Sequence, residues 1–244
     1  MSALVIIPAR MKATRLPGKP LALIDGVPMI VRVYQQAKKA HGVRVVVACG
    51  ESEIADVVKQ HGGEAVLTDP DLASGSDRIM AALEQIDPEK SHQLVINLQG
   101  DMPFVAPSII DQTIDQLYET SHCDISTLVA PEFSPEDRKS PDVVKAILAQ
   151  NGKALYFTRS QLYGDEPIWR HIGVYGYRRK ALEAFTRSRP TPLECREKLE
   201  QLRALELGLN IYASKIEQAP ISVDTPADLQ AAIDFAQTLN QSPK

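Results

Sequence analysis

A basic loop at residues 8–20 carries the side chains of this sequence that are best suited to hold phosphate groups. Four cationic side chains fall within ten residues of one another: Arg10, Lys12, Arg15 and Lys19. They stand out because the whole chain has a formal net charge of −4. Cations bind phosphate oxygens through charge-assisted hydrogen bonds, so the loop predicts a polyphosphate site. A solvated surface loop is the alternative interpretation.

The loop follows neither of the common glycine-rich phosphate motifs. A Walker A motif needs a glycine five residues before its Gly-Lys pair and a serine or threonine after that pair. Here position 13 is alanine, and Lys19 is followed by Pro20. The sequence also has no Gly-x-Gly-x-x-Gly turn, so it gives no support to a dinucleotide cofactor. We therefore expect side-chain cations to hold most of the phosphate charge.

Two acidic turns could hold a divalent cation beside such phosphates. Asp101 ends a Gln-Gly-Asp turn after an apolar run, and Asp224 precedes Thr225 and Pro226. Magnesium prefers one or two carboxylates together with phosphate oxygens, so the two turns and the basic loop predict a metal-phosphate site. Each aspartate also has a structural interpretation. Asp101 can be a turn former, and Asp224 can be a charge near a helix that Thr225 caps and Pro226 opens.

Three further segments are candidates with equally plain structural alternatives. The small-residue turn at 74–78, Ser-Gly-Ser-Asp-Arg, can bind a nucleoside through its backbone amides and hydroxyl groups, while Arg78 contacts an anion. Alternatively, the turn only caps a helix. His171 and Tyr175 share one face of a predicted strand, where a lone histidine is more often structural. The charged helical run at 193–203 can consist of solvated ion pairs.

The first half of the chain alternates predicted strands and helices, which indicates a parallel sheet with helices on its faces. Apolar runs predict strands at 4–7, 43–48, 64–68 and 94–98. Helical spacing predicts helices that open at Pro28 and that cover 51–60 and 76–86. Ligands of such sheets bind beyond the carboxyl ends of the strands, and the basic loop and Asp101 both lie there.

The second half is less regular. Strands are predicted at 124–130, 143–148, 154–157, 172–177 and 210–216, with helices at 179–188, at 193–207 and from Pro226 onward. Asn151-Gly152 predicts a hairpin between two of these strands, and 131–142 is a polar excursion. We expect an α/β fold with a mostly parallel twisted sheet, helices on both faces as in Rossmann-like proteins, and a smaller mixed β lobe. The expected organisation is one domain, 1–244, with that lobe at about 131–190.

Composition favours a soluble cytoplasmic protein that does not bind nucleic acid. The acidic charge balance opposes nucleic-acid binding. Cys49, Cys123 and Cys195 lie far apart and form no Cys-x-x-Cys pair, which fits a reducing compartment. The first apolar run turns polar at Arg10, too early for a signal peptide, and no apolar run approaches the length of a membrane span.

Eight short motifs follow one another along nearly the whole chain: Ile6–Arg10, Thr14–Leu21, Ser74–Arg78, Asn97–Asp101, Ala154–Arg159, Arg170–Tyr177, Leu199–Arg203 and Val223–Pro226. Taken together and in this order, they resemble the 3-deoxy-manno-octulosonate cytidylyltransferase family, the CMP-Kdo synthetases of Gram-negative bacteria.

The resemblance implies transfer of CMP from CTP to the anomeric hydroxyl of 3-deoxy-D-manno-octulosonate (Kdo) for lipopolysaccharide synthesis, with release of pyrophosphate and with Mg2+, in two ions, as cofactor. It implies a homodimer paired through the second half, whose lobe also carries sugar contacts. The catalytic residues would be Lys19, Asp101, Arg10 and Asp224. Of these, Asp101 and Asp224 would be the metal ligands. CTP would contact Pro8, Ala9, Arg10, Arg15, Lys19, Ser74, Gly75, Ser76, Gln99 and Asp101. The sugar acid would contact Arg78, Arg159, His171, Tyr175, Glu200 and Gln201.

Two other functions remain open at this point. One is a cytidylyltransferase for a related acid, such as 8-amino-Kdo or a sialic-like nonulosonate. The other is a non-catalytic nucleotide-sugar binder on the same fold. Such a binder could dispense with a metal carboxylate or with Lys19, and this sequence retains both acidic residues and the full basic loop, which favours an enzyme.

Overall fold

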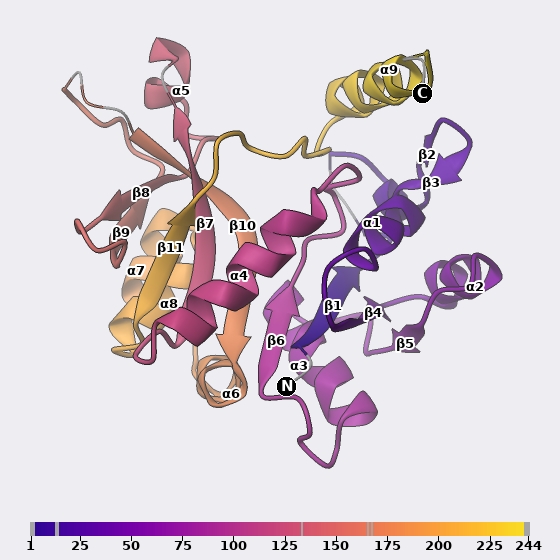
Figure 1. Ribbon diagram of the computed structural model, residues 1–244, viewed down its shortest axis with the longest axis horizontal. Coiled ribbons are helices and arrows are strands. Elements are labelled where there is room, and N and C mark those ends of the chain that lie inside the picture. The colour runs from indigo at the N-terminus through magenta and orange to yellow at the C-terminus, as the bar shows by residue number, and fades with distance from the viewer. Residues whose placement is uncertain (1–2, 13–14, 133, 165, 167, 242–244) are drawn as a thin grey trace. The chain divides into compact units, whose positions relative to one another are not determined.

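The computed structural model describes residues 3–12, 15–132, 134–164, 166 and 168–241. The chain folds as two units, which are considered separately (Figure 1). The first contains residues 1–92, 97–108 and 220–244, and the second contains residues 93–96 and 109–219. The lobe expected at about 131–190 falls within the second unit. Its expected role in sugar and dimer contacts stays a prediction.

A parallel sheet forms the centre of the first unit. Strand β1 (Ala3–Ala9) pairs with β4 (Val43–Cys49), and β4 pairs with β5 (Ala65–Leu67), all in parallel. The strands are apolar along almost their whole length because helices cover the sheet. These helices are α1 (Met29–Ala37), α2 (Ser52–Gln60) and α3 (Gly75–Ile86), close to their predicted positions.

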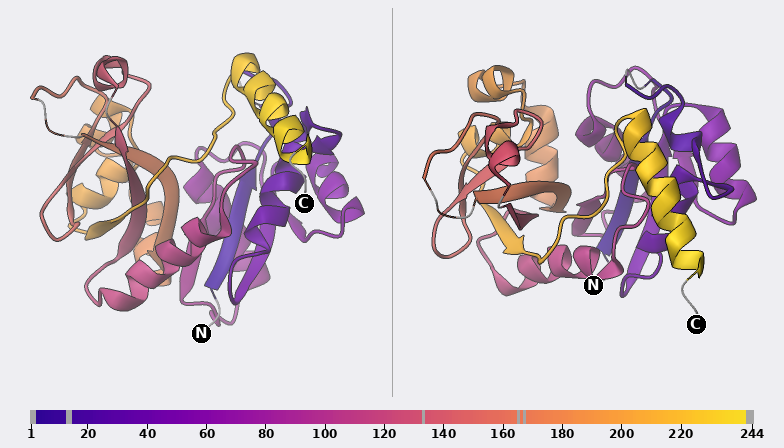
Figure 2. Two further views of the ribbon diagram at one scale, coloured as in Figure 1. Left: turned by 45° about the horizontal axis from the view of Figure 1, so that its top comes forward. Right: turned by 90° about the horizontal axis from the view of Figure 1, so that it is seen from above.

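The last helix, α9 (Pro226–Gln241), belongs to the first unit and packs on a small hairpin of β2 (Leu23–Ile24) and β3 (Val27–Pro28) (Figure 2). The buried residues of this cluster are Ile24, Met29, Val223, Ala232 and Ala236. As predicted, the helix begins at Pro226, directly after its cap Thr225, whose hydroxyl accepts from the Asp228 amide at 3.2 Å. Asp224 therefore stands at the start of a firmly packed helix.

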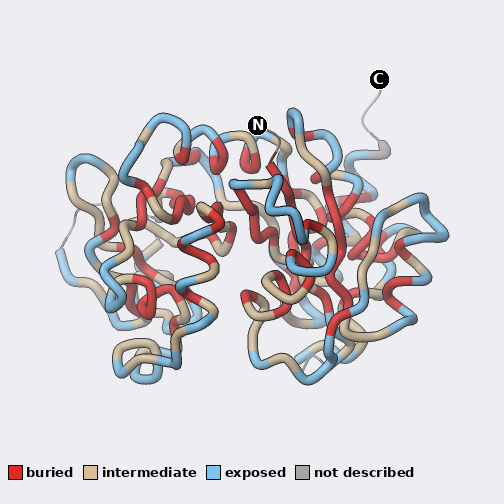
Figure 3. Tube along the Cα trace, turned by 90° about the horizontal axis from the view of Figure 1, so that it is seen from below, coloured by how far each residue is buried: buried red, intermediate tan, exposed pale blue. Residues whose placement is uncertain are grey.

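The second unit is built on a mixed sheet. Its strands are β6 (Leu94–Asn97), β7 (Ile125–Glu132), β10 (Ile168–Arg178) and β11 (Ile211–Lys215), together with a hairpin of β8 (Lys145–Leu148) and β9 (Ala154–Thr158). Strand β7 pairs antiparallel with β10 and parallel with β11. The hairpin turns at Asn151-Gly152, as predicted. Chain segments along the strands are mostly buried and the connecting loops are exposed (Figure 3).

The helices of the second unit are α4 (Pro107–Glu119), α5 (Pro135–Lys139), α6 (Arg179–Arg187), α7 (Pro192–Glu197) and α8 (Gln201–Glu206). They differ from the sequence-based expectation in three places. Helix α4 was not predicted, and α5 lies in the polar excursion. The single helix expected at 193–207 is wrong, because Lys198 adopts a left-handed φ of 55° that ends α7 before α8 begins.

The α/β prediction is confirmed: a mostly parallel sheet is flanked by helices, and a smaller antiparallel part accompanies it. The thiols of Cys49, Cys123 and Cys195 are all free. Within the described ranges, the helices include none of the length and apolar character that crossing a membrane requires.

Candidate functional site

The basic loop leaves the carboxyl end of β1 and turns back on itself before Lys19. Gly18 adopts a left-handed φ of 71°, which glycine reaches without steric cost. Its amide donates to the Met11 carbonyl at 3.3 Å, and a short 3-10 helix at Lys19–Leu21 follows. This turn fixes the backbone from which the Lys19 side chain extends. Ala13 and Thr14, which belong to the predicted loop, lie outside the described residues.

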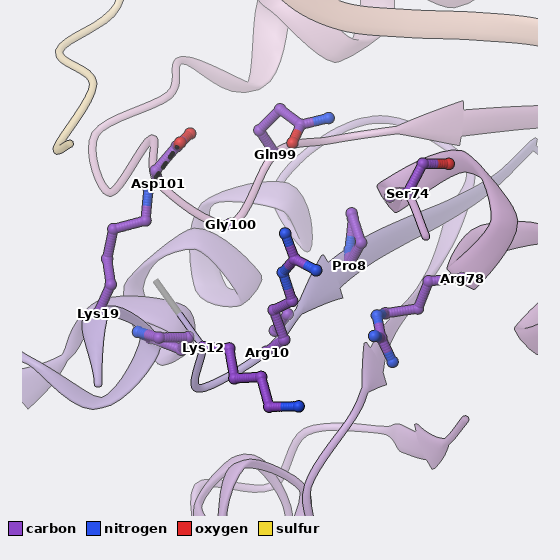
Figure 4. A pocket seen from close by; sticks show the side chains of 12 residues that line it. Pro8, Arg10, Lys12, Lys19, Ser74, Arg78, Gln99, Gly100 and Asp101 are labelled. Carbon is purple, nitrogen blue, oxygen red and sulfur yellow. Dashed lines mark hydrogen bonds and ion pairs between the residues drawn. The ribbon is translucent and has the colours of Figure 1, made fainter. Parts of the chain in front are cut away.

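A pocket of about 310 Å3 opens over this loop within the first unit. Its lining residues are Pro8, Ala9, Arg10, Lys12, Lys19, Pro20, Ser74, Gly75, Arg78, Gln99, Gly100 and Asp101. In the view of Figure 4, Lys19 and Asp101 lie on one side, Ser74 and Arg78 on the other, and Arg10 between them. The volume suits a small ligand, and the cations among the lining residues suit an anionic one.

Lys19 bridges the two aspartates that the sequence singled out. Its Nζ donates to Asp101 Oδ2 at 3.0 Å and to Asp224 Oδ1 at 3.1 Å. Burial alone would lower the pKa of Lys19, but Asp101 and Asp224 outweigh burial and raise it. Burial raises the pKa of Asp101, and the Lys19 ammonium opposes that rise. Arg15 adds a second cation, with its Nη2 3.4 Å from Asp224 Oδ2.

Backbone contacts hold the two acidic turns together. The Val223 amide donates to the Asp101 carbonyl at 2.9 Å. On the other side, Asp228 Oδ2 accepts from the amides of Asp224 at 3.1 Å and Thr225 at 2.8 Å. Hydrogen bonds lower the pKa of Asp228 against the effect of its burial. The main chain that carries both metal-ligand candidates is therefore fixed by hydrogen bonds as well as by the packing of α9.

The donor set fits a magnesium ion that shares its coordination with phosphate. Two carboxylates converge on one cation, and Asp101 Oδ1 is buried without a hydrogen-bond partner among the described residues. Those residues offer no cluster of three or more histidine, cysteine, aspartate or glutamate side chains. That matches magnesium, which is usually held by one or two carboxylates, water and substrate phosphates in place of a complete protein cage. Asp101 and Asp224 are the residues that could hold it.

The Ser74 turn is both a helix cap and a wall of the pocket. Ser74 Oγ accepts from the Asp77 amide at 3.1 Å and so caps α3. Arg78, one turn along, is 2% exposed and donates to Thr68 Oγ1 at 2.6 Å and to the carbonyl of Asp69 at 3.0 Å. Burial lowers the pKa of Arg78. The two interpretations that the sequence left open for this turn are thus compatible.

Most of the predicted CTP-binding residues line this pocket, and two do not. Arg15 lies beside Asp224, and Ser76 is buried in the first turn of α3. Arg78 was predicted for the sugar acid, and it lies in the first unit among the residues that line this pocket. The remaining predicted sugar contacts belong to the second unit: Arg159, His171, Tyr175, Glu200 and Gln201.

His171 and Tyr175 lie together in a row of aromatic rings. The His171 ring is 5.0 Å from Phe157 and 5.4 Å from Tyr175, between ring centroids. Desolvation lowers the pKa of His171 to about 3, so the ring is neutral near pH 7. Burial raises the pKa of Tyr175, and the nearby Tyr177 and Glu200 add to the rise. Both groups are therefore uncharged hydrogen-bonding partners.

The other predicted sugar residues are anchored in different ways. Arg159 Nη1 donates to the Pro141 carbonyl at 2.8 Å. Glu200 Oε1 lies 3.6 Å from Arg203 Nη2, and Gln201 is 7% exposed at the start of α8. Lys145, fully buried, donates from Nζ to the carbonyls of Ser140 and Arg159. It thereby supports the chain at Arg159.

Sequence reasoning missed several supporting residues. Asp228 had a signal, because a threonine followed three residues later by an acidic residue is a capping-box pattern. Lys12 lines the pocket and was counted only as part of the charge. Lys145 had no signal in the sequence, because its role depends on the position that the folded chain gives to the carbonyls of Ser140 and Arg159.

Comparison with known proteins places the chain among nucleotidyltransferases. A cytidylyltransferase family model matches residues 4–214. A 3-deoxy-manno-octulosonate cytidylyltransferase of Parvibaculum lavamentivorans is 53% identical over 94% of this chain and 90% of its own length. A 3-deoxy-manno-octulosonate cytidylyltransferase of Rhodopseudomonas palustris is 50% identical over 95% of this chain and 96% of its own length.

Solved structures agree. The structure of a CMP:2-keto-3-deoxy-manno-octonic acid synthetase complexed with CTP is similar with a TM-score of 0.92 and 32% identity, covering 98% of this chain and 100% of that one. The structure of a putative glucose-1-phosphate thymidylyltransferase from Bacillus anthracis is similar with a TM-score of 0.68 and 18% identity. The match covers 99% of this chain and 98% of that one and shows a shared fold.

Proposed function

This chain belongs to the cytidylyltransferase family, and on that premise we propose that it transfers CMP from CTP to the anomeric hydroxyl of Kdo. The products are CMP-Kdo and pyrophosphate. The observation that carries the proposal is the Lys19 bridge between Asp101 and Asp224, in which Lys19 and Asp101 also line the pocket with its further cations. The names of the relatives and the CTP complex of the similar structure supply the substrates.

In this proposal the basic loop binds the triphosphate. Arg10, Arg15 and Lys19 neutralise the charge that grows on pyrophosphate as the bond between the α-phosphorus and its bridging oxygen breaks. The attacking hydroxyl stands on a crowded quaternary carbon and is a weak nucleophile. Positioning and charge neutralisation must therefore supply most of the rate enhancement. A residue that acts in this way affects turnover more than ground-state binding.

Asp101 and Asp224 would hold Mg2+, and the proposal includes two such ions. When bound, magnesium neutralises phosphate charge and lowers the pKa of a coordinated hydroxyl. The protein then needs no strong general base of its own. Ser74, Gly75, Ser76 and Gln99 would lie along the cytidine. Gln99 is held in place by a hydrogen bond from its Nε2 to Asn97 Oδ1 at 2.9 Å.

The sugar acid would contact Arg78, Arg159, His171, Tyr175, Glu200 and Gln201. These side chains combine cations for a carboxylate with neutral groups for hydroxyls. The proposal also includes a homodimer that pairs through the second unit and a cytoplasmic location, with the product entering lipopolysaccharide synthesis. The homodimer and the lipopolysaccharide role rest on the family resemblance, and the cytoplasmic location rests on composition and cysteine usage.

A panel of pyrophosphate-release assays tests the function. Purified protein is supplied with CTP, UTP, ATP or GTP, each without an acceptor and with Kdo, 8-amino-Kdo or a nonulosonate. We expect release with CTP and Kdo above every other pair. Faster release with another acid would assign the chain to a related cytidylyltransferase. CTP binding without release under any condition would identify a non-catalytic nucleotide-sugar binder.

A further inference from the structure

A buried hydroxyl group touches the imidazole of His171 from the neighbouring strand. Thr127, on β7, is fully buried, and its Oγ1 lies 3.0 Å from His171 Nε2. The same oxygen lies 2.9 Å from the Val174 carbonyl oxygen and 3.2 Å from that of Ile172. Three polar atoms therefore surround one hydroxyl group.

A break in strand register brings these carbonyls to the threonine. Along β10 the pairing with β7 passes from Ile172 opposite Leu128 directly to Tyr175 opposite Thr127. Gly173 and Val174 are the extra residues of this bulge. Bulged backbone turns carbonyl groups out of the regular ladder, and here two of them meet a side chain. The arrangement is thus built into the pairing of the two strands.

The number of protons decides which ring nitrogen of His171 carries hydrogen. A threonine hydroxyl has one proton to donate and can accept as well. Both carbonyl oxygens can only accept, so the Thr127 proton is directed to one of them. Two bare acceptors would otherwise face each other across 2.9 Å in a buried site. The ring nitrogen must then be the donor, which makes His171 the Nε2–H tautomer.

The other nitrogen, Nδ1, is left with a lone pair. It has no hydrogen-bond partner among the residues that the structure describes. The phenol of Tyr175 lies against the ring, and its raised pKa keeps it neutral near pH 7. A bare imidazole nitrogen accepts a hydrogen bond from O–H or N–H and repels a carboxylate oxygen.

We propose that Thr127 is a positioning residue that fixes His171 as the Nε2–H tautomer, so that His171 Nδ1 accepts a hydrogen bond from a hydroxyl of the sugar acid. The inference rests on the proposed function for the identity of the ligand. It assigns His171 to a hydroxyl and leaves the carboxylate of the sugar acid to the arginines. An amino group in place of that hydroxyl would also be accepted, because it too can donate.

The tautomer can be measured without any substrate. In protein labelled with 15N at histidine, long-range 1H–15N correlation separates protonated from bare ring nitrogens. We expect wild-type His171 to be neutral, with Nε2 protonated and Nδ1 bare, and we expect Thr127→Val to lose this single-tautomer pattern. A protonated Nδ1 in the wild type would overturn the inference. Because this measurement needs no turnover, it can fail or succeed independently of the proposed function.

Kinetics supply the second readout. Thr127→Val should raise the KM for Kdo about tenfold, as expected when one well-placed hydrogen bond is lost, and should leave the KM for CTP unchanged. Thr127→Ser keeps the hydroxyl and should restore the wild-type KM. Thr113→Val is the matched control, because Thr113 is equally buried and its hydroxyl donates to the Ile109 carbonyl at 2.7 Å, on α4. An equal rise in the control would show a general packing effect and refute the assignment.

A pair of amide substitutions distinguishes the two ring nitrogens. An asparagine side chain places its polar atoms near the position of Nδ1, whereas glutamine reaches the position of Nε2. His171→Asn should therefore retain more Kdo binding than His171→Gln. The opposite order, in two variants whose thermal unfolding matches the wild type, would mean that Nε2 faces the ligand and that Thr127 has no positioning role.

Discussion

Replacing Lys19 by methionine tests whether the lysine occupies a cation position between the two aspartates. Methionine keeps most of the side-chain volume and removes the charge. Since a divalent cation must displace or repel the ammonium in order to use both carboxylates, Lys19→Met should bind Mn2+ more tightly than the wild type when no nucleotide is present. Manganese serves as the probe because it takes the same oxygen ligands as magnesium.

The distances set the size of the effect. At the dielectric constant of water, unit charges 3.0 Å apart interact by about 1.4 kcal/mol. The second contact at 3.1 Å adds a similar amount, giving about 2.7 kcal/mol in total. A displaced ammonium keeps part of this attraction, so we expect the Mn2+ affinity to rise by about ten- to a hundredfold.

The assay is a titration of the protein with Mn2+, in which electron paramagnetic resonance reports the free ion. Lys12→Met is the matched control, because Lys12 belongs to the same loop but pairs with Asp71 at 3.1 Å on the surface, with side chains 75% and 78% exposed. Its Mn2+ affinity should equal that of the wild type. CTP added to the wild type should also tighten Mn2+ binding, because the phosphates then attract the ammonium.

Unchanged or weaker Mn2+ binding by Lys19→Met would refute the reasoning. It would mean either that Asp101 and Asp224 are not metal ligands or that the ammonium does not compete for them. The double variant Lys19→Met, Asp101→Asn separates these possibilities, because it binds Mn2+ more weakly than Lys19→Met only if Asp101 is a ligand.

Three further predictions concern individual side chains. Asp101→Asn and Asp224→Asn should each lower kcat about a hundredfold or more, with CTP binding by titration better preserved in the Asp224 variant; near-normal turnover of Asp224→Asn at saturating Mg2+ would reduce that residue to a helix-terminus charge. The low pKa of His171, about 3 against 6.5 in the unfolded chain, means that the unfolded state alone binds this proton between those values. Stability should therefore fall as the pH falls, by about 2 kcal/mol from pH 7 to pH 5 in urea unfolding, relative to His171→Asn. Parallel pH profiles of the two proteins would argue against a desolvated neutral ring. Lys145→Met leaves the carbonyls of Ser140 and Arg159 without their hydrogen-bond donor and should lower the free energy of unfolding in urea by about 1–3 kcal/mol. An unchanged midpoint would show that water replaces the ammonium.

The sequence indicated the first unit well because its signals are local. A buried strand, a basic loop and a Gly-Asp turn lie within short stretches, and parallel strands bring their carboxyl ends to one edge. Lys19, Asp101 and Asp224 could thus be nominated before their contacts were known. Their bridge could not, because it joins residues that are 82 and 205 positions apart.

The second unit was harder to predict for physical reasons. The prediction of one helix at 193–207 was wrong because Lys198 adopts a left-handed conformation, which a lysine in the sequence does not predict. The contact between Thr127 and His171 depends on a bulge in the pairing of β7 and β10, and one threonine in an apolar strand carries no such signal. Long-range register, more than local propensity, determines these positions.

The most direct test of the central claim is the identity and stoichiometry of the products. Wild-type protein, CTP, Kdo and Mg2+ are incubated together, and mass spectrometry and a pyrophosphate assay follow the same samples, with Asp101→Asn in parallel. We predict that one CMP-Kdo appears for each pyrophosphate, that neither forms without Kdo, and that Asp101→Asn forms almost none. Pyrophosphate without CMP-Kdo, or equal product from Asp101→Asn, would contradict the account.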